Sequence, residues 1–244
     1  GTPACKRFAV LYFDELAYTP SALWMALRLL RIDQKPINFV VDATNYVMFD
    51  IGQPLHAFDA QVLDRKLFGP RMAVNGEQLT VLGDTNLTLQ ETDMVIADGS
   101  TAVALAGIKG GMHSGVSHKT TSVLLESATF DGGTVRLASS FHKLRTDASA
   151  RFEKELDPAQ NVTAIKRFVA LVHTTGLPMH HAPFVLSLGV LPAPTVIEVM
   201  HSFIESRLGI TVEQGKVQEL LEPLGFVVKE KELKTGVVYS ITVP

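Results

Sequence analysis

Short apolar segments, separated by turn residues, run through the first two thirds of the chain. Four of them are rich in β-branched, aromatic or aliphatic side chains and predict strands: residues 7–13, 78–82, 103–106 and 123–125. The dipeptide Asn75-Gly76 predicts a two-residue hairpin turn that joins strands at 66–74 and 78–82. Strands and hairpin turns, without a regular βαβ alternation, predict an α+β fold whose sheets are mainly antiparallel.

Apolar residues also recur at intervals of three or four, which predicts helices. The segments with this spacing are residues 19–30, 134–141 and 161–174. Another helix is predicted to start near residue 40 and to end at Gly52-Gln53-Pro54. This last helix opens the stretch VVDATNYVMFDIGQPLHAFD at residues 40–59, in which polar groups and His56 stand among apolar residues.

The polar side chains of this stretch have two interpretations. Buried polar atoms need partners, so Asp42, Thr44, Asn45 and His56 could line a ligand pocket. Alternatively, Asp42 or Thr44 caps a buried helix and a backbone carbonyl satisfies His56. Composition by itself favours the second interpretation.

A proline-rich segment at residues 178–194 interrupts the pattern of predicted helices and strands, and we place a domain boundary near Pro183. Within this segment His180-His181 lacks neighbouring cysteines or acids and is more typical of a linker than of a metal site. Several elements are predicted beyond the boundary: a strand at 196–199, helices at 202–208 and 213–224, and a hairpin of 226–228 with 237–243. The chain is therefore expected to form a domain over 1–183 and a smaller α/β module over 184–244.

Composition and charge narrow the class of protein. The chain has 244 residues, 46% of them apolar and 19% charged, which predicts a sizeable core. Its net charge of −3 argues against a broad basic surface, so any contact with nucleic acid is expected to be local. The single cysteine, Cys5, has no partner for an intramolecular disulfide, which fits a reducing cytoplasm. No apolar run reaches membrane-spanning length, and the terminal residues lead us to expect an excised fragment.

Two further segments carry candidate chemistry. AGIKGGMHSGV at residues 106–116 contains three closely spaced glycines, Gly107, Gly110 and Gly111, which either form a turn or let a ligand approach the backbone. Its spacing matches neither a P-loop nor a dinucleotide fingerprint. Glu126 follows an apolar segment and has only small or apolar neighbours. A carboxylate in such a place is either paired or available to a ligand.

Five strings in this chain resemble the β chain of bacterial phenylalanyl-tRNA synthetases, in order and in spacing. They are VVDATNYV, GQPLHAFD, AGIKGGMHSGV, VLLESATF and RTDASARFEKELDP. The region after the proline-rich segment is similar to the small winged-helix-like module that follows the editing module in that family. The chain departs from the family at Lys109, where the glycine segment generally has an apolar residue.

The resemblance implies a proofreading pocket that hydrolyses tyrosine from mischarged tRNA(Phe). An apolar synthetic pocket rejects an added hydroxyl only about a hundredfold, so a second site that requires this hydroxyl is useful. Glu126 matches the family glutamate that receives the tyrosine hydroxyl. Gly110, Thr146 and Ala148 match pocket positions beside the tyrosyl group. Another set matches positions near the terminal adenosine and the scissile ester: His56, Asn45 and Thr44.

The resemblance also implies the partners. These are tRNA(Phe) carrying tyrosine and the synthetase α chain, which holds the sites for ATP, phenylalanine and magnesium. No cofactor, metal ion or membrane is therefore expected for this chain, and the cytoplasm is its expected location.

Two alternative functions remain open. The chain could be a non-catalytic module that binds tRNA or assembles the subunits, and a free-standing editing protein acting in trans is a less favoured possibility. A hydrolytic pocket predicts that His56 and Glu126 share one cavity, whereas a scaffold would leave them apart or paired with other side chains.

Overall fold

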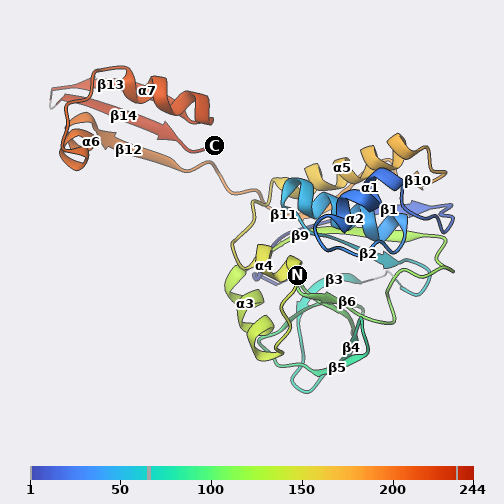
Figure 1. The fold of residues 1–244 in the computed structure, drawn as a ribbon. Helices are drawn as coiled ribbons and strands as arrows, with labels where there is room; N and C mark the ends of the chain where they lie inside the picture. The colour runs from blue at the N-terminus through green and yellow to red at the C-terminus, as the bar shows by residue number, and fades with distance from the viewer. Residues whose placement is uncertain (1, 65–66, 235) are drawn as a thin grey trace. The chain divides into compact units, whose positions relative to one another are not determined.

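The computed structural model describes residues 2–64, 67–234 and 236–244. The chain divides into two compact units, Gly1–Leu191 and Pro192–Pro244 (Figure 1). Each unit has its own hydrophobic core.

A five-stranded antiparallel sheet runs through the middle of the first unit. Its path is β10 (His180–His181), β1 (Cys5–Asp14), β9 (Val123–Phe130) and β2 (Leu55–Asp59), and β11 (Leu186–Gly189) also pairs with β1. The long strands β1 and β9 pair over almost their full lengths. Because side chains alternate between the faces of a strand, each face of this sheet can pack against a different layer.

Three helices cover one face of the sheet: α1 (Leu23–Leu30), α2 (Phe39–Ile51) and α5 (Gln160–Thr175) (Figure 1). The core between helices and sheet includes the rings of Phe13, Phe39 and Phe168, which are fully buried or nearly so. The helix predicted from residue 40 is thus confirmed, but its cap is not Asp42 or Thr44. Asn38 caps it by accepting a hydrogen bond from the Val41 amide at 3.0 Å.

The opposite face of the sheet packs against a second layer, which is rich in strands (Figure 1). This layer contains a four-stranded antiparallel sheet of β3 (Phe68–Met72), β6 (Met94–Asp98), β7 (Thr101–Leu105) and β8 (Lys109–Gly110). It also contains the hairpin β4 (Gln78–Val81)–β5 (Thr85–Thr88) and the helices α3 (Gly132–Phe141) and α4 (Asp147–Phe152). Every strand pair among the described residues is antiparallel, so the predicted α+β class is confirmed.

The predicted hairpin at Asn75-Gly76 is wrong. Strand β3 pairs with β6, and β4 pairs with β5. The turn between β4 and β5 contains Gly83 and Asp84, both with positive φ, and this conformation suits a tight hairpin. Lys66, the first residue of the predicted strand at 66–74, lies outside the described residues.

The boundary of the first unit lies at Leu191 instead of Pro183, because the chain returns to the sheet after Pro183. Residues 186–189 form β11, which pairs with β1 from Arg7 to Val10. His180 and His181 are also part of the sheet, as β10, and not of a linker.

The second unit is a small α/β module with a three-stranded antiparallel sheet. Its elements are β12 (Val196–Met200), α6 (His201–Leu208), α7 (Lys216–Leu221), the 3-10 helix η1 (Glu222–Leu224), β13 (Val227–Leu233) and β14 (Gly236–Thr242). The predicted hairpin is confirmed as the pair β13–β14, with β12 on the other side of β14. Tyr239 is fully buried at the centre of this sheet, and its hydroxyl lies 2.9 Å from Nδ1 of His201.

Candidate functional site

A cavity of about 70 Å³ lies between the five-stranded sheet and the second layer of the first unit. The polar residues of its wall are His56 on β2, Glu126 on β9 and Lys109 on β8. Apolar side chains make up much of the rest of its wall, among them Leu105, Phe130 and Phe152. The volume is several times that of one water site, so the cavity has room for part of a ligand.

Strand pairing places His56 directly opposite Glu126. The two residues are partners in the antiparallel register of β2 and β9. Directly opposite residues point to the same face, so both side chains point towards the second layer. The sequence separates these residues by seventy positions, and the sheet brings them to one cavity wall.

Nε2 of the His56 imidazole is buried and has no hydrogen-bond partner among the described residues. This finding contradicts the interpretation in which a backbone carbonyl satisfies the side chain. The ring packs edge to face on Phe58, with centroids 4.4 Å apart. Burial lowers the pKa of His56 from 6.5 to about 4, so the ring is neutral at pH 7.

The carboxyl group of Glu126 is also buried, with the residue 6% exposed. It forms no hydrogen bond or ion pair with any residue that the structure describes. Burial raises the pKa of Glu126 from 4.5 to about 8, so this side chain is mostly the neutral acid at pH 7. A neutral carboxylic acid can both donate and accept a hydrogen bond.

We expect the stability of the first unit to fall between pH 6.5 and about pH 8. The raised pKa of Glu126 makes folding less favourable as pH rises from 4.5 to about 8, because the unfolded state loses this proton first. The lowered pKa of His56 makes folding more favourable as pH rises from about 4 to 6.5, because the unfolded state binds more protons there. The two effects oppose each other between pH 4.5 and 6.5. Above pH 6.5 only the effect of Glu126 remains, so the free energy of unfolding falls there.

Denaturant unfolding between pH 4 and 9 checks this expectation. Glu126→Gln is uncharged at every pH and should remove the fall above pH 6.5. If the variant keeps the same fall, another group is responsible for it.

The three closely spaced glycines of the segment at 106–116 each have their own structural reason. A Cβ at Gly110 would lie 2.4 Å from Cε1 of His56, so the absence of a side chain makes room for the imidazole. A Cβ at Gly111 would lie 2.4 Å from the Val103 carbonyl oxygen, so this glycine allows two backbone segments to approach. Gly107 has a φ of 72°, where other residues are strained. Gly110 is therefore the member of the set that shapes the cavity around His56.

Helix α4 supplies another part of the cavity wall through Ala148. Thr146 caps this helix, with its Oγ1 accepting from the Ser149 amide at 3.1 Å. The same hydroxyl donates to the Ile108 carbonyl at 3.0 Å and so ties the helix to the glycine segment. Thr146 does not line the cavity itself, but it bonds to Ile108, which does.

Thr44 and Asn45 do not line the cavity. They belong to α2, whose core residues pack on the other face of the five-stranded sheet. Thr44 donates its hydroxyl to the Val41 carbonyl at 2.7 Å within the helix. Asn45 is partly buried and makes no side-chain hydrogen bond to any residue that the structure describes. The structure thus groups four predicted residues around the cavity (His56, Glu126, Gly110 and Ala148) and separates these two from it.

Gln53 supports the pairing of β2 with β9 through a side-chain hydrogen bond, and no motif pointed to this role. In the register that pairs His56 with Glu126, the residue opposite Ala128 is Pro54, which has no N–H to donate. The fully buried Gln53 replaces this missing donor, with Nε2 at 2.9 Å from the Ala128 carbonyl oxygen. A glutamine directly before a proline at the start of a strand is the only signal in the sequence.

Replacing Gln53 with leucine should lower the free energy of unfolding by about 1–3 kcal/mol, because the Ala128 carbonyl would be left buried and unpaired. Pro54→Ala restores a backbone N–H at the position that needs one. The cost of Gln53→Leu should therefore be smaller in the Pro54→Ala background, as measured by urea unfolding of all four proteins. An equal cost in both backgrounds would show that the donor to Ala128 is not what Gln53 contributes.

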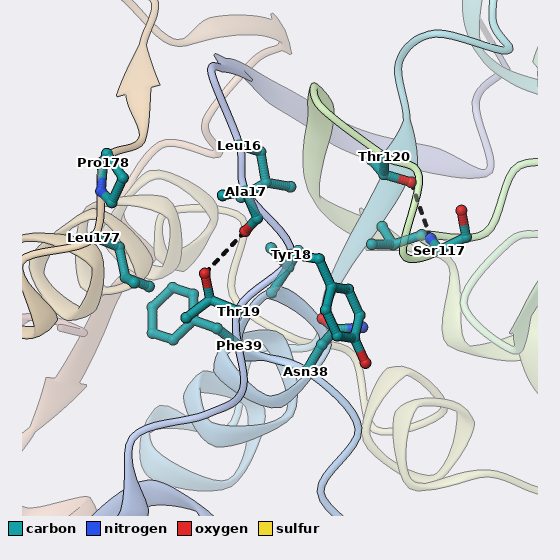
Figure 2. A pocket seen from close by; sticks show the side chains of 12 residues that line it. Leu16, Ala17, Tyr18, Thr19, Asn38, Phe39, Ser117, Thr120, Leu177 and Pro178 are labelled. Atoms are coloured by element: carbon teal, nitrogen blue, oxygen red, sulfur yellow. Dashed lines mark hydrogen bonds between the residues drawn. The ribbon is translucent and has the colours of Figure 1, made fainter.

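Other hollows fit a substrate site less well. Figure 2 shows one of about 10 Å³ between the β1–α1 connection, the start of α2 and the end of α5. It is lined by residues such as Leu16, Phe39 and Leu177, and it has room for about one water molecule. A hollow of about 670 Å³ in the second unit is mainly apolar, with Leu208 and Leu220 in its wall. Neither hollow contains a buried acid facing an imidazole.

No group of three or more His, Cys, Asp or Glu side chains among the described residues is arranged to hold a metal ion. Within the same residues, no helix is both long and apolar enough to cross a membrane.

Comparison with known proteins places the chain in a family. A family model described as the B3/4 domain matches residues 4–176. The phenylalanine–tRNA ligase beta subunit of Solibacter usitatus is 40% identical over 247 residues, which cover 98% of this chain and 31% of that protein. The beta subunit of Bacillus cereus is 46% identical over 153 residues, which cover 63% of this chain and 19% of that protein.

Among solved structures, an N-terminal fragment of the phenylalanyl-tRNA synthetase beta subunit from Pyrococcus horikoshii aligns with a TM-score of 0.43 and 14% identity. The alignment covers 97% of this chain and 64% of that one.

The match covers most of the first unit, including all residues that line its cavity, and the chain belongs to this domain family. The resemblance to the phenylalanine–tRNA ligase beta subunit, drawn from the motifs, is confirmed. The chain spans less than a third of the length of these relatives.

Proposed function

We propose that the cavity between β2 and β9 hydrolyses the ester bond of tyrosyl-tRNA(Phe). The observation that carries this proposal is an imidazole whose buried Nε2 has no hydrogen-bond partner, opposite a buried carboxyl group that also has none among the described residues. Both groups belong to one cavity wall. Leaving two such groups unpaired lowers stability by about 1–3 kcal/mol each. A site that receives a polar ligand gives a reason for this cost.

Glu126 is the group that distinguishes tyrosine from phenylalanine in this proposal. A phenolic hydroxyl both donates and accepts hydrogen bonds, and so does the neutral carboxylic acid. The two groups can therefore satisfy each other inside an apolar wall that suits an aromatic ring. A phenylalanyl group leaves the acid unpaired, and such a loss can give large discrimination.

His56 acts as a hydrogen-bond acceptor for the hydrolysis. Because its pKa is about 4, the neutral ring is a weak base and is better suited to orient a water molecule or the vicinal ribose hydroxyl. The oriented water attacks the ester carbonyl, the bond to the ribose oxygen breaks, and that oxygen takes up a proton. The products are tyrosine and uncharged tRNA. A positioned water and hydrogen-bond donors to the carbonyl oxygen are sufficient for such a reaction.

Thr44 and Asn45 have a separate part in the proposal. Thr44 is 6% exposed and its hydroxyl is bonded within α2, so it supports the helix that carries Asn45. Asn45, outside the cavity wall, is the residue that we assign to the terminal adenosine, which remains outside while the tyrosyl group enters. The amide of Asn45, which has no partner among the described residues, is free to bind a ribose or a base. The remaining partners in this proposal are tRNA(Phe) and the synthetase α chain, in the cytoplasm.

Single-turnover deacylation tests the proposal, with the full αβ enzyme and tRNA(Phe) charged with either amino acid. The tyrosyl ester should be hydrolysed much faster than the phenylalanyl ester, and His56→Ala should slow the reaction without changing the preference. If the enzyme binds both charged tRNAs but hydrolyses neither, the chain is a tRNA-binding or assembly module instead.

A further inference from the structure

Helix α1 has an outer face on which leucines alternate with cations. Met25 and Leu29 are buried against the first unit, whereas Leu23, Leu27 and Leu30 are 74%, 48% and 53% exposed. Trp24, Arg28 and Arg31 are exposed on the same helix and at its end, and Lys35 follows one turn later. We define these seven residues as the α1 face.

The aromatic part of the α1 face is held in place by neighbouring side chains. Trp24 packs edge to face on Tyr46 of α2, with ring centroids 5.3 Å apart. The guanidinium of Arg28 lies 5.4 Å from the Trp24 ring centroid and donates to the Tyr46 hydroxyl at 2.5 Å. The indole is nevertheless 38% exposed. A fixed and accessible ring beside a cation is a feature of surfaces on which unpaired bases stack.

The α1 face is positively charged in a chain that is negative overall. Residues 20–36 contain Arg28, Arg31 and Lys35 against the single acid Asp33, whereas the whole chain has a net charge of −3. Neither Arg31 nor Lys35 forms an ion pair with any residue that the structure describes. Both cations are therefore available to phosphate groups.

One hydrogen bond connects the end of α1 to the helix that borders the cavity. Gln34, just after α1, donates from Nε2 to the Asp147 carboxylate at 3.3 Å. Asp147 is the first residue of α4 and directly precedes Ala148 in the cavity wall. On the other side, Tyr46 follows Asn45 in α2. A strand whose last nucleotide is esterified in the cavity would therefore reach this face with the nucleotides that precede it.

We propose that the α1 face binds the unpaired 3′ end of the tRNA, next to the charged adenosine. In this arrangement Trp24 stacks on a base, and Arg31 and Lys35 contact phosphates. The inference rests on the proposed editing function for the identity of the RNA. An RNA strand fits better than a docked protein segment, because the face combines an excess of cations with a fixed aromatic ring and its helix is connected to the one that borders the cavity.

The test uses the full αβ enzyme and two tyrosyl esters, one of tRNA(Phe) and one of adenosine alone. The double variant Arg31→Ala/Lys35→Ala should lower kcat/KM for tyrosyl-tRNA about fivefold to twentyfold, and it should flatten the salt dependence of tRNA binding by about one to two units of slope. Hydrolysis of tyrosyl-adenosine, which is too short to reach the face, should be unchanged. Lys166→Ala, which removes an exposed cation from α5, is the matched control and should change neither substrate.

Unchanged tRNA kinetics in the double variant would overturn the inference, and so would an equal loss with both esters. A protein partner is tested with Leu23→Ser/Leu27→Ser. Loss of αβ assembly in this variant, with tRNA binding intact, would also overturn it. If the wild-type enzyme hydrolyses neither ester, the editing proposal fails, and binding of uncharged tRNA by the same variants still decides whether the α1 face contacts RNA.

Discussion

Glu126→Ala is expected to remove most of the preference of the enzyme for the tyrosyl ester over the phenylalanyl ester. The substitution takes away the group that, in our proposal, pairs with the phenolic hydroxyl in an apolar wall. A hydrogen bond that must be made in a buried site contributes about 1–3 kcal/mol, which corresponds to about a 5- to 150-fold change in relative rate. Single-turnover deacylation of both charged tRNAs measures the preference directly, and tRNA binding should be largely unchanged.

Glu126→Gln is the matched control for this prediction. Its amide has nearly the same shape and, like the neutral acid, both donates and accepts hydrogen bonds. The variant should keep most of the tyrosyl preference at pH 7 if the neutral acid recognises the hydroxyl. If Glu126→Gln loses the preference at pH 7 as severely as Glu126→Ala does, the carboxylate is the form that recognises tyrosine. If Glu126→Ala keeps the wild-type preference, the hydroxyl is recognised by another residue.

Gly110→Ala is expected to slow hydrolysis of tyrosyl-tRNA about a hundredfold, which is the order of loss for a misplacement of about 1 Å in a reacting group. The new methyl group would lie 2.4 Å from Cε1 and 2.7 Å from Nε2 of His56, so the imidazole must move. The ring also packs against Phe58, which restricts where it can go. The measurement is single-turnover deacylation together with urea unfolding, which separates a displaced ring from a destabilised domain.

A double-mutant cycle with His56→Ala identifies the cause. If Gly110 serves to accommodate the imidazole, then Gly110→Ala should have little further effect once the imidazole has been removed. Gly133→Ala, in helix α3, is the control. Its new methyl group would approach a carboxylate oxygen of Asp131, at 3.2 Å, and neither residue lines the cavity. Equal losses with and without His56 would show that bulk at position 110 blocks the substrate itself.

The elements of this fold could largely be predicted from local pattern, but their pairing could not. Apolar alternation correctly indicated β1 and the start of β9, and helical spacing indicated α2 and α5. The predicted hairpin at Asn75-Gly76 was wrong because β3 pairs with β6, which begins only at Met94. Which strands pair depends on how two layers bury their apolar faces together, and a local turn signal contains no information about this.

The same division applies to the candidate site. The family motifs identified His56, Glu126, Gly110 and Ala148, all of which the fold brings to one cavity. They did not show that Gly110 makes room for His56, or that Gln53 supplies the hydrogen bond that Pro54 cannot. Both facts depend on distances between segments that are far apart in the sequence or on the register of a strand pair.

The sequence by itself determined the family, the α+β class and the residue types available for chemistry, because motif order and hydrophobic period are local properties of the chain. The tertiary structure decided which of those residues act together. The antiparallel register of β2 and β9 puts His56 opposite Glu126, and strand alternation turns both towards the second layer while α2 carries Thr44 and Asn45 on the other face. Burial in that layer then makes both side chains neutral at pH 7, and this electrostatic result depends on desolvation by the surrounding fold.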